Sequence, residues 1–255
     1  MGNETGSVTY HCASGVGIIE FQHPASNALP GFLLDELART IDAASEDPDC
    51  RVVLLKSGGN KAFCAGASFD ELMAIQNEAE GLKFFSGFSK VILAMRRCPK
   101  FVVCRVQGKA VGGGVGVAAA ADITYATESA SVKLSELAIG IGPFVVGPAV
   151  ERKMGTGPFT ALATDAATWF PANWAHTHGL FAALFDDVQT MDDAIERLTQ
   201  QLAGSSPEAM KALKSVFWEG TEHWESLLPQ RAAISGKLVL SDFTRQAIAQ
   251  FKTKA

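Results

Sequence analysis

The stretch Gly112-Gly113-Gly114-Val115-Gly116-Val117, followed by Ala118-Ala119-Ala120-Ala121-Asp122, decides how this sequence is interpreted. It comes after an apolar, β-branched run over 101–106, which is typical of a buried strand, and its small residues predict a helix. A strand that leads through glycines into a helix presents free backbone N–H groups and the positive end of the helix dipole. The stretch therefore predicts a site for a permanent or developing negative charge.

Predicted strands and helices alternate on both sides of this stretch, and Pro99 ends the longest helix. Their order requires crossover connections, so we expect an α/β fold with a mainly parallel sheet and helices outside it. The predicted strands are 7–12, 17–21, 51–56, 101–106 and a strand pair around 123–126 and 131–134, and the predicted helices are 31–45 and 78–97.

After about Pro158 the predicted elements are mostly helical, without a repeat or a low-complexity linker. We expect a helical extension of the same fold rather than a free domain, because these helices have apolar faces to bury. The helices are expected around 161–163, 194–202, 207–218, 222–228 and 242–252, with an extended segment at 181–185.

Composition limits the possible functions. The 255 residues are 47% hydrophobic and 19% charged, which is typical of a globular protein with a sizeable core. The net charge of -5 argues against a nucleic-acid partner, and neither a bilayer-spanning run nor a signal-peptide pattern is found, so no membrane partner is expected. The five cysteines contain no CxxC pair, which favours a reduced, cytoplasmic protein without a zinc site or a disulfide framework.

Four further motifs occur in a fixed order around the glycine stretch: Asn27-Ala28-Leu29, the segment from Lys61 to Ala67, the segment from Ser135 to Ile141, and the tail from Ala249 to Lys252. Over nearly the whole chain the ordered set resembles the crotonase superfamily, the enoyl-CoA hydratase/isomerase family. The resemblance implies a ClpP-like ββα spiral core over residues 1–190 and a helical C-terminal trimerisation region over 191–255. It also implies a homotrimer or a dimer of trimers.

The resemblance assigns a role to two glycine-containing loops. In this family two backbone N–H groups hold the thioester carbonyl of an acyl-CoA, and motif position gives these donors as Ala67 and Gly113. Removing a proton next to a thioester places negative charge on its oxygen, and preorganised donors stabilise that enolate more than the ground-state carbonyl. Gly66 and Gly112 would let the backbones approach. Coenzyme A is then part of the substrate, and no separate cofactor is implied.

The acid–base residues indicate the reaction. Hydratases of this family use two glutamates to activate a water; this chain has Gly116 at the first position and Glu136 at the second. One carboxylate can still remove a proton from C2 of a 3-enoyl-CoA and return it at C4, the pattern of monofunctional Δ3,Δ2-enoyl-CoA isomerases. Burial among Ile139, Ile141 and Phe144 is expected to raise the pKa of Glu136. Dienoyl-CoA isomerases and aromatic acyl-CoA dehalogenases have an aspartate where this chain has Phe144, which argues against both.

Other functions remain open from the sequence. A hydratase, or a decarboxylase-like relative acting on acyl groups carried by CoA or a carrier protein, would use the same donors with a different acid. Asp70 and Glu71 are candidates for a second carboxylate, although a helix start capped by Ser68 also explains them. A non-catalytic acyl-CoA binder is a further alternative. The loose dinucleotide motif over 114–119 is disfavoured, because its expected acidic partner falls on Glu136, which has a better role.

The remaining expected contacts complete the site. Phe84, Phe85 and Phe88 lie on the helix after the first loop, which often walls the acyl pocket in this family. Cys64 is more simply a packing residue than a nucleophile, and the pair His176 and His178 lacks a third metal ligand. The expected catalytic residues are Glu136, Ala67 and Gly113, the substrate-binding residues Ala28, Ala65, Gly66, Ser68, Phe69, Gly112, Gly116, Phe144 and Phe85, and the CoA-binding residues Lys61, Ala65, Phe251 and Lys252.

Overall fold

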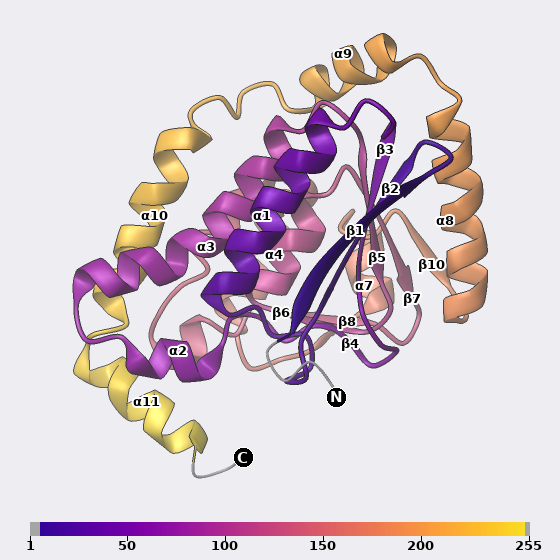
Figure 1. Ribbon diagram of the computed structural model, residues 1–255. Helices are drawn as coiled ribbons and strands as arrows, with labels where there is room; N and C mark the ends of the chain where they lie inside the picture. The colour runs from indigo at the N-terminus through magenta and orange to yellow at the C-terminus, as the bar shows by residue number, and fades with distance from the viewer. Residues whose placement is uncertain (1–5, 253–255) are drawn as a thin grey trace.

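The computed structural model describes residues 6–252, of which Phe251 and Lys252 are described by their backbone alone. A larger sheet runs through the middle of the molecule (Figure 1), with only its first two strands antiparallel to each other. The parallel arrangement is the one that the predicted crossovers require. Its strand order is β1 (Ser7–Ala13), β2 (Val16–Gln22), β3 (Val52–Ser57), β5 (Val102–Val106), β7 (Ile123–Thr127) and β10 (Ala183–Phe185).

A smaller sheet is built from short strands that alternate along the chain with strands of the larger sheet. Its order is β4 (Ala62–Cys64), β6 (Lys109–Val111), β8 (Ser131–Lys133) and β9 (Phe170–Pro171). β3 leads directly into β4, β5 into β6, and β7 into β8. Helices follow β4 and β6 before the chain returns to the larger sheet. The chain therefore winds through the repeated β-β-α turn that the resemblance implies.

The predicted strand pair around 123–126 and 131–134 is wrong as a pair. β7 lies in the larger sheet between β5 and β10, whereas β8 lies in the smaller sheet between β6 and β9. A tight turn, in which the N–H of Ala130 donates to the carbonyl of Thr127 at 3.0 Å, redirects the chain from one sheet to the other. The direction of such a turn cannot be read from strand periodicity.

Helices cover both faces of the larger sheet (Figure 1). Alternate residues of β3 face opposite ways: Val53 and Leu55 belong to one buried cluster, whereas Val52 packs with Met191 and Ile195 in another. The helices on the first face are α1 (Gly31–Glu46), α3 (Glu78–Arg97) and α4 (Gly113–Ala120). On the second face lies α8 (Val188–Ala203), and Met210 of α9 (Pro207–Phe217) joins the same cluster.

The C-terminal part is helical, as predicted, and continues the same packing. The expected boundary at residue 190 falls inside α8, which packs on the larger sheet. α10 (Trp224–Leu238) lies along α3 (Figure 1), and none of the helices in the described part is long and apolar enough to cross a membrane. The remaining helices are α2 (Phe69–Ala74), η1 (Leu137–Ile139), α5 (Gly147–Met154), α6 (Thr156–Thr164), α7 (Ala172–Thr177) and α11 (Asp242–Lys252).

A buried ion pair fastens α9 to the sheet. Lys214 Nζ lies 2.9 Å from Asp122 Oδ2, and each side chain is only 3% exposed. The same carboxylate accepts hydrogen bonds from the N–H of Val102 at 2.7 Å and from Nε1 of Trp218 at 2.9 Å. Lys214 also donates to the carbonyl of Lys100 at 2.8 Å. The pair is thus embedded in hydrogen bonds, the arrangement that a buried charge requires.

Candidate active site

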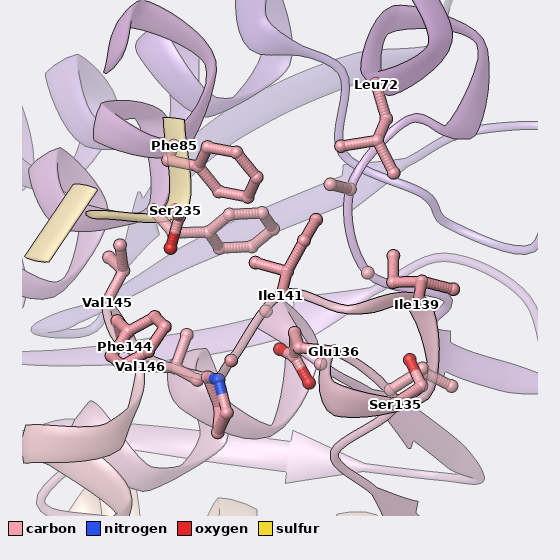
Figure 2. Close-up of a pocket in the computed structure, with 18 of the residues that line it drawn as sticks. Leu72, Phe85, Ser135, Glu136, Ile139, Ile141, Phe144, Val145, Val146 and Ser235 are labelled. Atoms are coloured by element: carbon pink, nitrogen blue, oxygen red, sulfur yellow. The ribbon is translucent and has the colours of Figure 1, made fainter. Parts of the chain in front are cut away.

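An apolar pocket opens where the two glycine-containing loops meet (Figure 2). Among the described residues that line it, Glu136 is the one ionisable side chain, and Ser135 and Ser235 are the hydroxyl-bearing ones. The other lining residues are Ala65, Gly66, Ala67, Phe69, Leu72, Phe84, Phe85, Phe88, Val111, Gly112, Gly113, Ile139, Ile141, Gly142, Pro143, Phe144, Val145 and Val146.

The two loops approach each other by their backbones. A β-carbon built on Gly66 would lie 4.0 Å from the nitrogen of Gly113 and 3.1 Å from the carbonyl oxygen of Val111. Gly66 has φ of 89°, which L side chains rarely adopt. Within residues 6–252, the N–H groups of Ala67 and Gly113 donate to no protein acceptor. Two free donors therefore border the pocket, and the second begins helix α4.

The segment that contains Asn27 and Leu29 contacts the chain on both sides of β4, a role that the sequence did not reveal. Nδ2 of Asn27 donates to the carbonyls of Gly58 at 2.8 Å and Ala62 at 2.9 Å. The N–H of Leu29 donates to the carbonyl of Gly66 at 2.8 Å. The motif at 27–29 therefore positions the loop that carries Ala67. Ala28, expected to bind substrate, is buried beside this contact and does not line the pocket.

Glu136 lies at the start of η1, and its side chain lines the pocket, with Ile141 drawn next to it in Figure 2. A β-carbon on Gly112 would lie 2.9 Å from its Oε1, and within the described residues its buried Oε2 has no hydrogen-bond partner. Burial raises the pKa of Glu136 to about 7, against a smaller opposing effect of its own backbone N–H. A carboxyl that titrates near neutrality suits a general base.

Position 116, where hydratases of this family have their first glutamate, has no room for a side chain. Gly116, expected to bind substrate, lies on α4 and is not among the described residues that line the pocket. A β-carbon there would lie 2.4 Å from Cγ1 of Val146, a lining residue that the sequence analysis did not name. Val146 therefore fills the space through which a side chain at position 116 would reach the pocket.

The candidate second carboxylates have structural roles. The Ser68 hydroxyl accepts from the N–H of Glu71 at 3.3 Å, so it caps α2, and it does not line the pocket. The Glu71 carboxylate accepts from the N–H of Gly31 at 2.7 Å, at the start of α1, where negative charge is favourable. Asp70 stands in the first turn of α2, where it complements the helix dipole in the same way. Neither acidic residue lines the pocket.

The other expected contacts divide into three groups. Phe69, Phe85 and Phe144 line the pocket, as do Ala65 and Gly112. Lys61 lies exposed in the loop before β4 and is not a lining residue, while the side chains of Phe251 and Lys252 lie outside the described residues. Burial raises the pKa of the Cys64 thiol to about 12, which keeps it protonated at neutral pH and disfavours a nucleophilic role.

Comparison with known proteins identifies the family. The enoyl-CoA hydratase/isomerase family model matches residues 11–252. The chain is 27% identical to carnitinyl-CoA dehydratase of Escherichia coli K12 (92% of this chain, 96% of the relative) and 26% identical to the peroxisomal Delta(3,5)-Delta(2,4)-dienoyl-CoA isomerase of Arabidopsis thaliana (88% and 84%). The crystal structure of enoyl-CoA hydratase from Bacillus halodurans superposes with a TM-score of 0.88 at 19% identity, covering 95% of this chain and 99% of that one.

The class defined by this fold and pocket is thus the crotonase superfamily, as the sequence indicates. The chain belongs to the enoyl-CoA hydratase/isomerase family. The two relatives compared above are named for different reactions, a dehydration and an isomerisation, so the choice between reactions depends on the residues of the pocket itself.

Proposed function

We propose that this protein is an enoyl-CoA isomerase that converts a 3-enoyl-CoA to the conjugated 2-enoyl-CoA, with Glu136 as its only proton-transferring carboxylate. The observation that carries this proposal is that Glu136 is the one ionisable side chain among the described lining residues, placed beside two free backbone donors. One carboxylate is sufficient to move a proton, whereas the paired-glutamate hydration of this family needs a second.

The reaction proceeds in two proton transfers. The thioester carbonyl accepts hydrogen bonds from the N–H groups of Ala67 and Gly113. Ionised Glu136 takes a proton from C2, and the electron pair of that C–H bond delocalises into the carbonyl to give the enolate. Glu136 then returns the proton at C4, while the double bond moves from C3–C4 to C2–C3. The substrate and product have the same atoms, so no separate cofactor or water is consumed.

The surroundings of the two backbone donors and of Glu136 favour the proposed proton transfers. Removing one oxyanion donor typically lowers the rate by about 10²–10³, because the donors act on charge that develops only during the reaction. The surrounding apolar side chains exclude water, which keeps the pKa of Glu136 near 7 and strengthens the backbone donors. At neutral pH a substantial fraction of Glu136 is ionised and can act as the base.

The other reactions on an acyl-CoA have less support. The dehydratase named among the relatives would require a group to protonate the departing oxygen, and the expected position for a second glutamate is Gly116, behind Val146. Phe144 lines the pocket where an aspartate would stand in a dienoyl-CoA isomerase. Hydration or decarboxylation with a different acid, and binding of an acyl group without turnover, are therefore the alternatives for the assay below.

Further expectations belong to the same proposal. Lys61, Phe251 and Lys252 would contact the coenzyme A moiety, and a carrier-protein arm is the alternative substrate handle. The assembly would be a homotrimer or a dimer of trimers built through the C-terminal helices. The cysteines within the described part are free thiols, which is compatible with a cytoplasmic protein.

An ultraviolet assay with two substrates tests the proposal. With a 3-enoyl-CoA, the absorbance of the conjugated thioester should rise, and the Glu136→Gln variant should show no rise. With a 2-enoyl-CoA, that absorbance should fall only to the small extent set by the isomerisation equilibrium, which favours the conjugated thioester. A larger fall, with a hydroxyacyl-CoA as product, would identify a hydratase, and silence with both substrates would favour decarboxylation or binding alone.

A further inference from the structure

We infer that Ser235 is a specificity residue that binds a neutral oxygen substituent, a hydroxyl or a ketone, on the acyl group. The inference rests on the proposed acyl-CoA substrate and concerns the part of the acyl group beyond the carbons that react. It assigns a substrate class: acyl chains that are mostly apolar and carry one uncharged oxygen.

Ser235 lies on α10 and is 1% exposed, and it lines the pocket. Figure 2 draws its Oγ at the end of the pocket where Phe85 and Val145 are labelled, away from Glu136. It is the one hydroxyl that a described helix places among these apolar lining residues.

The Ser235 hydroxyl makes no hydrogen bond with the part of the protein that the structure describes. Some helical hydroxyls elsewhere in the chain bond to their own helix: Thr199 donates to the carbonyl of Ile195 at 2.9 Å, and Ser215 to that of Lys211 at 3.0 Å. The oxygen of Ser235 is not among the sealed, unpartnered polar atoms of the described residues, so it faces the pocket. An acyl group that covered this hydroxyl would leave it without a partner unless the substrate itself supplied an oxygen.

The packing of α10 fixes where this hydroxyl lies. A β-carbon on Gly81 of α3 would lie 2.7 Å from Cα of Gly236, so the backbones of the two helices are in contact beside Ser235. A β-carbon on Gly236 would lie 2.7 Å from the nitrogen of Leu82. The short side chain of Ser235 is therefore held at a fixed place in the pocket wall, which favours binding by a preorganised group.

The charges of the pocket select a neutral substituent. No lysine, arginine or histidine is among the described lining residues, so a carboxylate on the acyl chain would have no counter-ion and would share the pocket with Glu136. A hydroxyl can donate to and accept from Ser235, and a ketone can accept from it. Phe84, Phe85 and Phe88 would pack on the hydrocarbon around that oxygen.

Binding and turnover, measured with matched acyl groups, test the inference. The binding probes are saturated acyl-CoAs of one chain length, either unsubstituted or with a single hydroxyl or ketone at successive carbons beyond C4. The kinetic probes are the corresponding 3-enoyl-CoAs. Wild-type protein should bind one oxygenated acyl-CoA about tenfold more tightly than the unsubstituted one, and kcat/KM should show the same preference, because a site built for an oxygen leaves its polar group unpaired without it.

Ser235→Ala should abolish this preference, mainly by weakening binding of the oxygenated acyl-CoA. Ser226→Ala is the matched control, because Ser226 is exposed on the same helix and donates to the carbonyl of His223; it should leave the preference unchanged. Equal affinity of wild-type protein for the whole series would overturn the inference, as would an unchanged preference in Ser235→Ala. A binding preference without turnover would support the inference and overturn the proposed isomerase function, and binding of no acyl-CoA would overturn both.

Discussion

Gly112 faces the carboxyl of Glu136 so closely that a β-carbon on the glycine would lie 2.9 Å from Oε1. Gly112 also has φ of 51° and ψ of -114°, a backbone conformation open to glycine but not to other residues. The loop that carries one backbone donor is therefore bordered by the only carboxylate of the pocket among the described residues. The proposed base and the proposed enolate site are parts of one local structure.

Gly112→Ala should lower kcat/KM by about 10²-fold or more, because the strained residue and its new methyl group would displace both the donor loop and Glu136. Its backbone strain should also lower the free energy of unfolding by about 1–3 kcal/mol. Gly220→Ala is the control, since Gly220 has φ of 79° and open space around its β-carbon position. The control should lose stability and keep its activity; full activity of Gly112→Ala would contradict the site geometry.

Gly116→Ala should destabilise the protein by about 1–3 kcal/mol through overpacking against Val146. Adding Val146→Ala in the same chain should recover most of that loss, because it removes the Cγ1 atom that lies 2.4 Å from the new β-carbon position. Thermal unfolding of the two single variants and the double variant measures the coupling. Strictly additive effects would show that Val146 does not close this position.

The pH dependence of turnover should report Glu136. Because its pKa is raised to about 7, kcat/KM should rise with pH through neutrality and level off once the carboxyl is ionised. Glu136→Gln should lower kcat/KM by about 10²–10⁴ and remove the inflection. The measurement is the initial rate of conjugated-thioester formation between pH 5 and pH 9, and a wild-type profile without an inflection near 7 would argue against this base.

Stability should depend on the same group with the opposite trend. The folded pKa of Glu136, about 7, exceeds its unfolded value of 4.5, so the folded state binds the proton more tightly. This contribution to stability is complete below pH 4.5 and is lost as pH rises through about 7. Relative to wild type, Glu136→Gln should therefore gain stability on going from pH 4.5 to pH 8, by on the order of 3 kcal/mol. Denaturant unfolding at both pH values measures the difference; an equal pH dependence of the two proteins would place the carboxyl in water.

Lys214→Met should destabilise the protein by about 3–5 kcal/mol, because it leaves the buried charge of Asp122 without its cation. Lys211→Met, at an exposed position of the same helix, should change stability by less than about 0.5 kcal/mol. Chemical unfolding of both variants tests the contrast. A small effect at Lys214 would mean that the hydrogen bonds from Val102 and Trp218 suffice to hold the carboxylate.

Long elements were predictable because their periodicity is expressed over many residues. The expected helix 78–97 has the same bounds as α3, and the expected strands 7–12 and 17–21 correspond to β1 and β2. The strands of the smaller sheet contain two or three residues each, which is too few to show alternation, and this sheet was not expected as a separate layer.

In the site, too, residues within local motifs were predictable, whereas residues brought in by tertiary packing were not. Glu136 and the two loops are named by motifs within the sequence, and the direction of the Glu136 pKa shift follows from its apolar neighbours. Val146 and Ser235 reach the pocket through tertiary packing alone: Val146 by lying against α4, and Ser235 by the close contact of Gly81 with Gly236. No pattern within α10 marks Ser235 as a pocket residue.

The most direct test of the central claim is product analysis after incubation of a 3-enoyl-CoA in water labelled with heavy oxygen. A single carboxylate that moves one proton predicts a 2-enoyl-CoA of unchanged mass, free of the label, and no product from Glu136→Gln. A hydroxyacyl-CoA that carries the heavy oxygen, formed at an equal rate by wild type and Glu136→Gln, would contradict it.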